Sequence, residues 1–158
     1  MPDAKTWLTP AAHSKLTAEL EHLTTTGREE IERRIAEARS YGDLRENGEY
    51  DTAKNDQGLM EARIRQVRAI LDTAVVREAE DNGTVGIGSI ATVVDDDGDE
   101  MEFFIAPAEN KLPGLLLASP DSPLGAALMG ARAGDVVTYQ APGGTFSYRV
   151  ANVRVYGR

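Results

Sequence analysis

The sequence predicts an α+β fold, in which an antiparallel α-helical coiled-coil hairpin precedes a compact domain of strands with one short helix. Two observations support this division. Apolar residues recur at helical spacing through residues 1–74, whereas short alternating runs separated by turns fill residues 75–158. Five of the seven prolines also lie in the second segment. We therefore expect two domains, an arm and a compact module.

Two apolar stripes predict the arm. Thr9 and Pro10 are typical of a helix start, as N-cap and first helical residue. The first stripe advances in steps of three or four through Leu16, Leu20, Leu23, Gly27, Ile31, Ile35 and Ala38. The second has heptad spacing through Tyr50, Ala53, Gln57, Met60, Ile64, Val67, Leu71 and Ala74. Two helices of roughly 30 and 25 residues would extend about 40–45 Å, and Gly27 would weaken the first by about 1 kcal/mol.

Alternation and turn residues predict six strands and one helix in the second segment. The helix would start at Asp121 or Ser122, reach Met129 and stop at Gly130. The runs DDDGDE and PGG read as hairpin turns. The strands are expected at 75–76, 89–95, 101–106, 115–118, 135–140 and 145–155.

Composition excludes several classes of protein. The net charge of −9 argues against binding to free nucleic acid, which requires clustered Lys and Arg. The absence of cysteine excludes disulfide scaffolds, thiolate metal sites and cysteine nucleophiles. No signal-peptide pattern opens the sequence, and no apolar run approaches the ~18 residues of a membrane span. We expect a soluble cytoplasmic protein that does not bind membranes.

Acidic residues gather at the predicted tip of the arm, residues 41–51. Asp43 and Glu46 are three residues apart, so in a turn both carboxylates can face one Mg²⁺ ion. Acids at the start of a helix also complement its dipole, and a hairpin tip is usually solvated. The spacing alone leaves both readings open.

Other motifs give no catalytic site. Asp95, Asp97 and Asp99 imitate an EF-hand opening, but Glu100 replaces the required glycine, so we expect an exposed acidic turn. His13 and His22 are nine residues apart, which suits neither a metal pair nor an acid–base couple. We do not expect the chain to be an enzyme on its own.

Four segments resemble the bacterial Gre family of transcript cleavage factors. EARSYGDLRENGEYDTAKNDQG, residues 37–58, resembles the family's tip signature, and residues 8–23 are similar to its first helix. Residues 122–135 and the APGG turn at 141–144 look like its C-terminal module. The resemblance implies an FKBP-like antiparallel β-sheet domain that docks on bacterial RNA polymerase beside the secondary channel. The arm would then carry its tip to the polymerase active centre.

The resemblance assigns the chemistry to the tip. Asp43 and Glu46, by motif position, would hold a Mg²⁺ ion shared with the polymerase active centre and position a water molecule. Two-metal chemistry of this kind would cut backtracked nascent RNA. The chain would thus stimulate the polymerase's own endonucleolytic cleavage, bind no stable cofactor alone, and meet the RNA 3′ end only within the elongation complex. We expect it to be a monomer.

Further residues acquire roles from the same resemblance, each with a simpler alternative. Leu44, Asn47 and Tyr50 would support the tip, or serve as turn and core residues. Arg39 and Lys54 would approach RNA phosphates, or form solvated salt bridges.

The loop before the short helix lies in a region that the family uses on the polymerase rim. Pro120, Asp121 and Ser122 would therefore bind polymerase, or simply cap the helix.

Two alternative functions remain at this point. Asp51 stands where the family often has His, and some Gre-like homologues inhibit polymerase through the same channel. A prolyl isomerase would need an aromatic-lined pocket, for which the second segment offers Phe103, Phe104, Tyr139, Phe146, Tyr148 and Tyr156. That reading leaves the arm unexplained.

Overall fold

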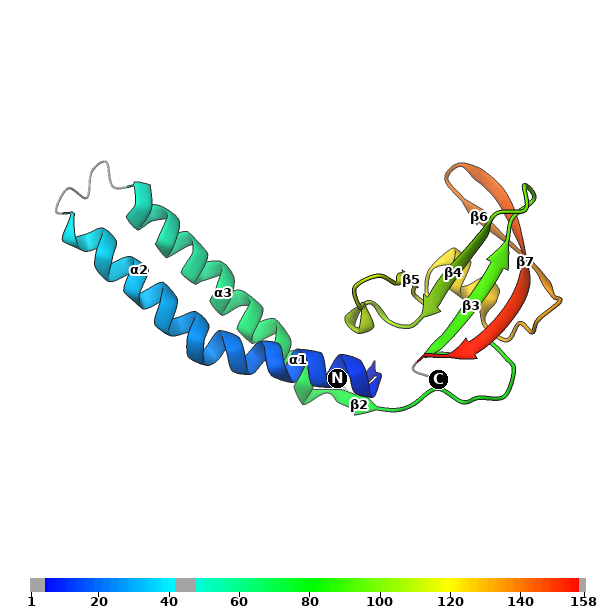
Figure 1. Cartoon of the computed structure of the whole chain (residues 1–158), viewed down its shortest axis with the longest axis horizontal. Coiled ribbons are helices and arrows are strands. Elements are labelled where there is room, and N and C mark those ends of the chain that lie inside the picture. Colours follow the sequence, from blue (N-terminus) through cyan, green and yellow to red (C-terminus); the bar gives the residue numbers. More distant parts are fainter. Residues whose placement is uncertain (1–4, 42–47, 157–158) are drawn as a thin grey trace. The chain divides into compact units, whose positions relative to one another are not determined.

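The chain forms two compact units (Figure 1). The computed structural model describes residues 5–41 and 48–156. The first unit holds residues 13–73, and the second combines residues 5–12 with residues from Ala74 onward. This division differs from the predicted one, 1–74 and 75–158, because residues 5–12 group with the C-terminal domain.

The first unit is the predicted helical hairpin. Its first helix consists of α1 (Pro10–His22), a π-helical segment η1 (Leu23–Gly27) and α2 (Arg28–Ser40), and α3 (Gly48–Asp72) returns beside it (Figure 1). The buried side chains come from the two predicted stripes, namely Leu16, Ile31, Ala38, Ala53, Ile64 and Val67. Every helix among residues 5–41 and 48–156 is too short or too polar to traverse a bilayer.

The π-helical segment explains an irregularity in the first stripe. Six steps of 3.5 residues from Leu16 lead to position 37, yet the stripe ends at Ala38, one residue further. A π turn accommodates one additional residue within a helix, so η1 keeps both halves of the stripe on α3. Gly27, the predicted weak point, lies in this turn, where a Cβ would approach the Met60 sulfur to 3.1 Å.

Among the described residues, three ion pairs connect the helices of the hairpin. Arg63 donates to both carboxylate oxygens of Glu19, at 2.6 and 2.9 Å, and Arg28 binds Glu61 in the same two-pronged way, at 3.0 and 3.1 Å. The third pair joins Arg34 to Asp56 at 2.9 Å. As the residue numbers increase along the first helix, the numbers of their partners in α3 decrease, which confirms that the two helices are antiparallel.

The second unit is built on a five-stranded sheet with the order β5-β4-β3-β7-β6. The strands lie within two residues of their predicted bounds: β3 (Ser89–Val94), β4 (Glu100–Ile105), β5 (Leu116–Ala118), β6 (Val136–Ala141) and β7 (Gly144–Val155). The prediction of a purely antiparallel sheet is wrong at one edge, where β5 pairs parallel with β4. Residues 106–115, which contain the 3-10 helix η2 (Ala108–Asn110), connect these two strands.

A short helix completes the core of this unit. α4 (Pro123–Leu128) begins after Ser122, as predicted, and Gly130 follows it with φ +83°. Leu128 is fully buried in a cluster with residues from the sheet and its flanking segments, namely Val85, Ala91, Val93, Ile105, Ala118, Ala131, Val137 and Val150.

A small parallel sheet adds a strand that the sequence analysis missed. β1 (Thr6–Leu8) pairs with β2 (Ala74–Val76), which was expected as 75–76. Leu8 is fully buried, and the residues just before α1 group with the second unit.

Candidate functional site

The predicted tip lies between the end of α2 and the start of α3. Asp43, Leu44, Glu46 and Asn47 fall outside the described residues, so the structure bears on the site through the two helix ends that flank them.

Arg39 and Tyr50 face each other across these helix ends. The guanidinium carbon of Arg39 lies 5.8 Å from the centre of the Tyr50 ring, a cation–π distance. Tyr50 is half-buried and Arg39 is exposed. The contact joins the last turn of α2 to the first turn of α3. In the sequence, the motif acids fall between Arg39 and Tyr50.

Acidic and basic groups are exposed around the same helix end. Glu49 and Asp51 lie in the first turn of α3, where the positive end of the helix dipole stabilises negative charge. Lys54 is exposed as well, and its Nζ donates to Oε1 of Gln57 at 3.1 Å. Lys54 therefore bonds to a neutral amide where the simpler alternative expected a salt bridge. The charge of Lys54 lies at the surface.

The predicted polymerase-binding loop has a clear structural role. Oγ of Ser122 accepts from the Gly125 N–H at 3.1 Å and donates to the Ser119 carbonyl at 2.6 Å, so Ser122 is the N-cap of α4. Asp121 is exposed, and Pro120 is half-buried beside it. Ser122 therefore has the capping role, and Asp121 beside it lies at the surface.

The acidic run before β4 forms the expected turn. Oδ1 of Asp95 accepts from the N–H groups of Asp97 and Asp99, each at 2.9 Å. The three carboxylates lie within 4.8 Å of one another, and β4 begins at Glu100, where an EF-hand loop would continue. Turn geometry accounts for the whole cluster.

The aromatic residues do not converge on one pocket. Phe104 is fully buried against Tyr156, with ring centres 5.2 Å apart. A second group of rings runs across the sheet from β4 to β7 and β6, and is formed by Phe103, Tyr148, Tyr139 and Phe146. A hydrogen bond with Tyr139, reinforced by burial, raises the pKa of Tyr148 to about 12, so this hydroxyl is neutral at physiological pH.

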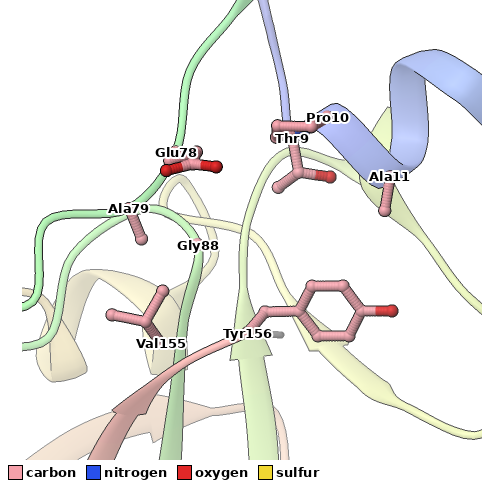
Figure 2. A pocket seen from close by; sticks show the side chains of 8 residues that line it. All are labelled: Thr9, Pro10, Ala11, Glu78, Ala79, Gly88, Val155 and Tyr156. Atoms are coloured by element: carbon pink, nitrogen blue, oxygen red, sulfur yellow. The ribbon is translucent and has the colours of Figure 1, made fainter. Parts of the chain in front are cut away.

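A cavity of about 210 Å³ in the second unit contains one aromatic ring (Figure 2). It is lined by Thr9, Pro10, Ala11, Glu78, Ala79, Gly88, Val155 and Tyr156. An isomerase pocket requires several aromatic walls, and this cavity has only the Tyr156 ring.

Comparison with known proteins gives the family. The family description "Transcription elongation factor, N-terminal" matches residues 6–76, and "Transcription elongation factor, GreA/GreB, C-term" matches residues 80–155. The chain belongs to the GreA/GreB family of transcription elongation factors. The predicted resemblance is therefore confirmed over nearly the whole sequence.

Individual Gre relatives match with similar coverage. Transcription elongation factor GreA of Streptomyces coelicolor is 42% identical over 153 residues, which cover 95% of this chain and 90% of the relative. GreA of Chloroflexus aurantiacus is 41% identical over 157 residues, covering 98% and 100%. The crystal structure of GreA factor homolog 1 (Gfh1) of Thermus thermophilus is 28% identical and covers 96% of this chain and 99% of that one, with a TM-score of 0.45. At that score the likeness carries no geometric conclusion.

Sequence reasoning missed two pairings among the described residues, one beside the predicted tip and one in the second unit. The contact of Arg39 with Tyr50 was recoverable, because the stripes of an antiparallel hairpin bring residues just before the tip opposite those just after it. The hydrogen bonds of Asn110 to Trp7 and Thr9 span about a hundred residues and leave no periodic signal.

Proposed function

We propose that this chain stimulates cleavage of backtracked nascent RNA by bacterial RNA polymerase, with its arm inserted through the secondary channel. One observation carries the proposal: in the sequence, the acidic Gre motif containing Asp43 and Glu46 falls between the two helices of a hairpin, in a chain that belongs to this family. The factor would act in the cytoplasm as a monomer, and would meet RNA only within the elongation complex.

The tip residues divide the work in this proposal. The carboxylates of Asp43 and Glu46 are suitable ligands for a Mg²⁺ ion shared with the polymerase. With an ion held there, these two carboxylates would supply the metal-assisted chemistry of phosphodiester hydrolysis, namely activation of the attacking water or stabilisation of the leaving oxygen. Leu44, Asn47 and Tyr50 would support the turn.

Basic residues and the docking loop would complete the interaction. The exposed charges of Arg39 and Lys54 would lie near RNA phosphates, whose negative charge they complement. Pro120 and Asp121 would contact the polymerase rim, while Ser122 holds their loop through its cap of α4.

The test uses stalled, backtracked elongation complexes supplied with Mg²⁺ and this protein. We expect the RNA to shorten from its 3′ end. Asp43→Asn and Glu46→Gln should each slow cleavage by at least about a hundredfold, because each removes a charged metal ligand. Both variants should compete with the wild-type protein for polymerase as well as before. Loss of competition together with activity would contradict the assigned roles.

A second candidate, inhibition of polymerase, is favoured by Asp51, whose carboxylate is exposed in the first turn of α3. An inhibitor would slow nucleotide addition and leave the backtracked RNA uncut. Asp51→His tests this alternative directly: it should relieve the inhibition if the extra negative charge causes it, and should leave cleavage unchanged if cleavage is the function.

A further inference from the structure

Asn110 is a fully buried polar side chain far from the tip motif in sequence. It ends the 3-10 helix η2, in the connection between β4 and β5, with 0% of its surface exposed. Burying an amide costs free energy unless its polar atoms are hydrogen-bonded. The partners of Asn110 therefore show what its burial serves.

Those partners lie at the N-terminus of the chain. Oδ1 of Asn110 accepts from the Thr9 N–H at 2.7 Å, and Nδ2 donates to the Trp7 carbonyl at 2.8 Å. A longer bond from Nδ2 reaches the Pro107 carbonyl at 3.3 Å. Only an amide side chain offers a donor and an acceptor in this arrangement at neutral pH, since a carboxylate lacks the donor.

Other contacts hold the same N-terminal segment within the second unit. Trp7 pairs with Val75 in the small parallel sheet, and the Arg77 guanidinium carbon lies 5.8 Å from the centre of the Trp7 ring. Oγ1 of Thr9 accepts from the Ala12 N–H at 3.1 Å and thereby caps α1. Asn110 thus forms hydrogen bonds with the backbone on both sides of Leu8, immediately before α1 begins.

We propose that Asn110 is a positioning residue for RNA cleavage. It anchors the start of α1 to the second unit, and α1 continues from there into the helical hairpin that carries the motif acids. The inference rests on the proposed function. Cleavage requires its catalytic groups to be placed closely, and a displacement of about 1 Å can cost on the order of a hundredfold in rate. Docking on polymerase through the loop before α4 does not require such close placement, so it should not depend on the hydrogen bonds of Asn110.

The test measures the cleavage rate at increasing factor concentrations for Asn110→Ala and Asn110→Asp. We expect the concentration for half-maximal effect to stay within about twofold and the maximal rate to fall about tenfold or more. Ser89→Ala is the matched control. Ser89 is 1% exposed, and its Oγ accepts from the Gly86 N–H at 3.0 Å, a hydrogen bond within the same unit that involves none of residues 5–12. This control should keep the wild-type maximal rate.

A second measurement follows the anchor itself. Trp7 is the only tryptophan of the chain, so its emission and the amide exchange of residues 5–12 report on the segment that Asn110 holds. In Asn110→Ala the emission should shift to the red and exchange should accelerate about tenfold, with β3 unaffected. Asn110→Asp keeps the side-chain volume and the Thr9 bond but loses both donated bonds, and it decides the question if Asn110→Ala does not fold.

Three results would overturn the inference. They are a wild-type maximal rate in the folded Asn110 variants, a loss no larger than that of Ser89→Ala, and unchanged exchange in residues 5–12. A wild-type protein that shortens no RNA would overturn the proposed function and the positioning role together. Failure of the Asn110 variants alone would leave the proposed function standing.

Discussion

Gly125, in the short helix α4, packs so closely against the preceding loop that no side chain fits. A Cβ at this position would lie 1.8 Å from the Ser119 carbonyl oxygen and 3.0 Å from Oγ of Ser122. The Ser119 carbonyl is itself held by the Ser122 hydroxyl, so the loop cannot retreat without losing the cap of α4. The glycine thus permits the conformation of the loop that contains Pro120 and Asp121.

Gly125→Ala should therefore destabilise the second unit by about 3 kcal/mol or more, because backbone must move to admit the methyl group. The same substitution at Gly58 is the control. Gly58 is exposed in α3, and a Cβ there would meet nothing within 4 Å, so Gly58→Ala should stabilise the helical hairpin by roughly 0.5–1 kcal/mol. Urea unfolding followed by circular dichroism measures both changes, and equal effects at the two glycines would contradict the packing argument.

At the scale of the elements, the ion pair between α1 and α3 makes the hairpin sensitive to acid. Two hydrogen bonds from Arg63 hold the pKa of Glu19 below its ordinary value of 4.5, against the opposing effect of burial, and nearby Lys15 acts in the same direction as Arg63. Because the pKa is lower in the folded state, the pair stabilises the hairpin above pH 4.5, and this contribution is lost as the pH falls below that value.

Glu19→Gln should lower the free energy of unfolding at pH 7 by up to about 1 kcal/mol, the usual range for partly exposed pairs. At pH 3 the variant and the wild type should differ less, because this pH is below the ordinary value of 4.5, so the unfolded-state carboxyl is protonated and the contribution of the lowered pKa shrinks. Thermal unfolding of the helices at the two pH values gives the comparison. Glu30→Gln, at an exposed position of α2, should show no such pH-dependent difference from the wild type; a matching dependence would assign the effect to general charge.

The π-helical segment leads to a prediction about chain length. η1 contains no buried residue, and the Thr24 and Thr25 hydroxyls donate to the carbonyls of Leu20 and Glu21 at 2.8 and 2.7 Å. Deleting Thr25 should convert the segment into a regular α-helix and keep both halves of the apolar stripe on α3, at a cost of about 1 kcal/mol or less.

Deletion of Glu32, an exposed residue of α2, is the control for this prediction. It removes one residue where no π turn lies, so the helix beyond it would rotate by about 100°. Ile35 and Ala38 would leave the seam, and the hairpin should lose several kcal/mol. Urea midpoints measure both deletions, and equal losses would show that η1 does not absorb an extra residue.

For the whole molecule, the sequence predicts the elements that carry a long periodic signal. The two helical stripes and the alternating strands β3, β4, β6 and β7 extend over six or more residues each, enough for their period to be visible. The sequence analysis missed β1 because this strand has three residues and its partner β2 lies far along the chain. The parallel pairing of β5 was not predicted either, because the direction of a strand depends on the path of the connection before it, which leaves no local pattern in the sequence.

The site divides in the same way. The motif identified the family, and the tip acids Asp43 and Glu46 stay a prediction from the same motif, because a local run of residues carries both signals. Asn110 looked like an ordinary loop residue, and only its three-dimensional partners, Trp7 and Thr9, give it a role.

The most informative test of the whole molecule asks which unit the N-terminus stabilises. Leu8 is 0% exposed in β1, so Leu8→Ala should cost about 2–5 kcal/mol, and the loss should fall on the second unit. Amide exchange should then accelerate in β3 and β7 but not in α3. Ile64→Ala, at a position 1% exposed in α3, should give the opposite pattern. If Leu8→Ala instead accelerated exchange in α3 alone, residues 5–12 would belong energetically to the arm, because a buried side chain stabilises the unit whose interior it fills.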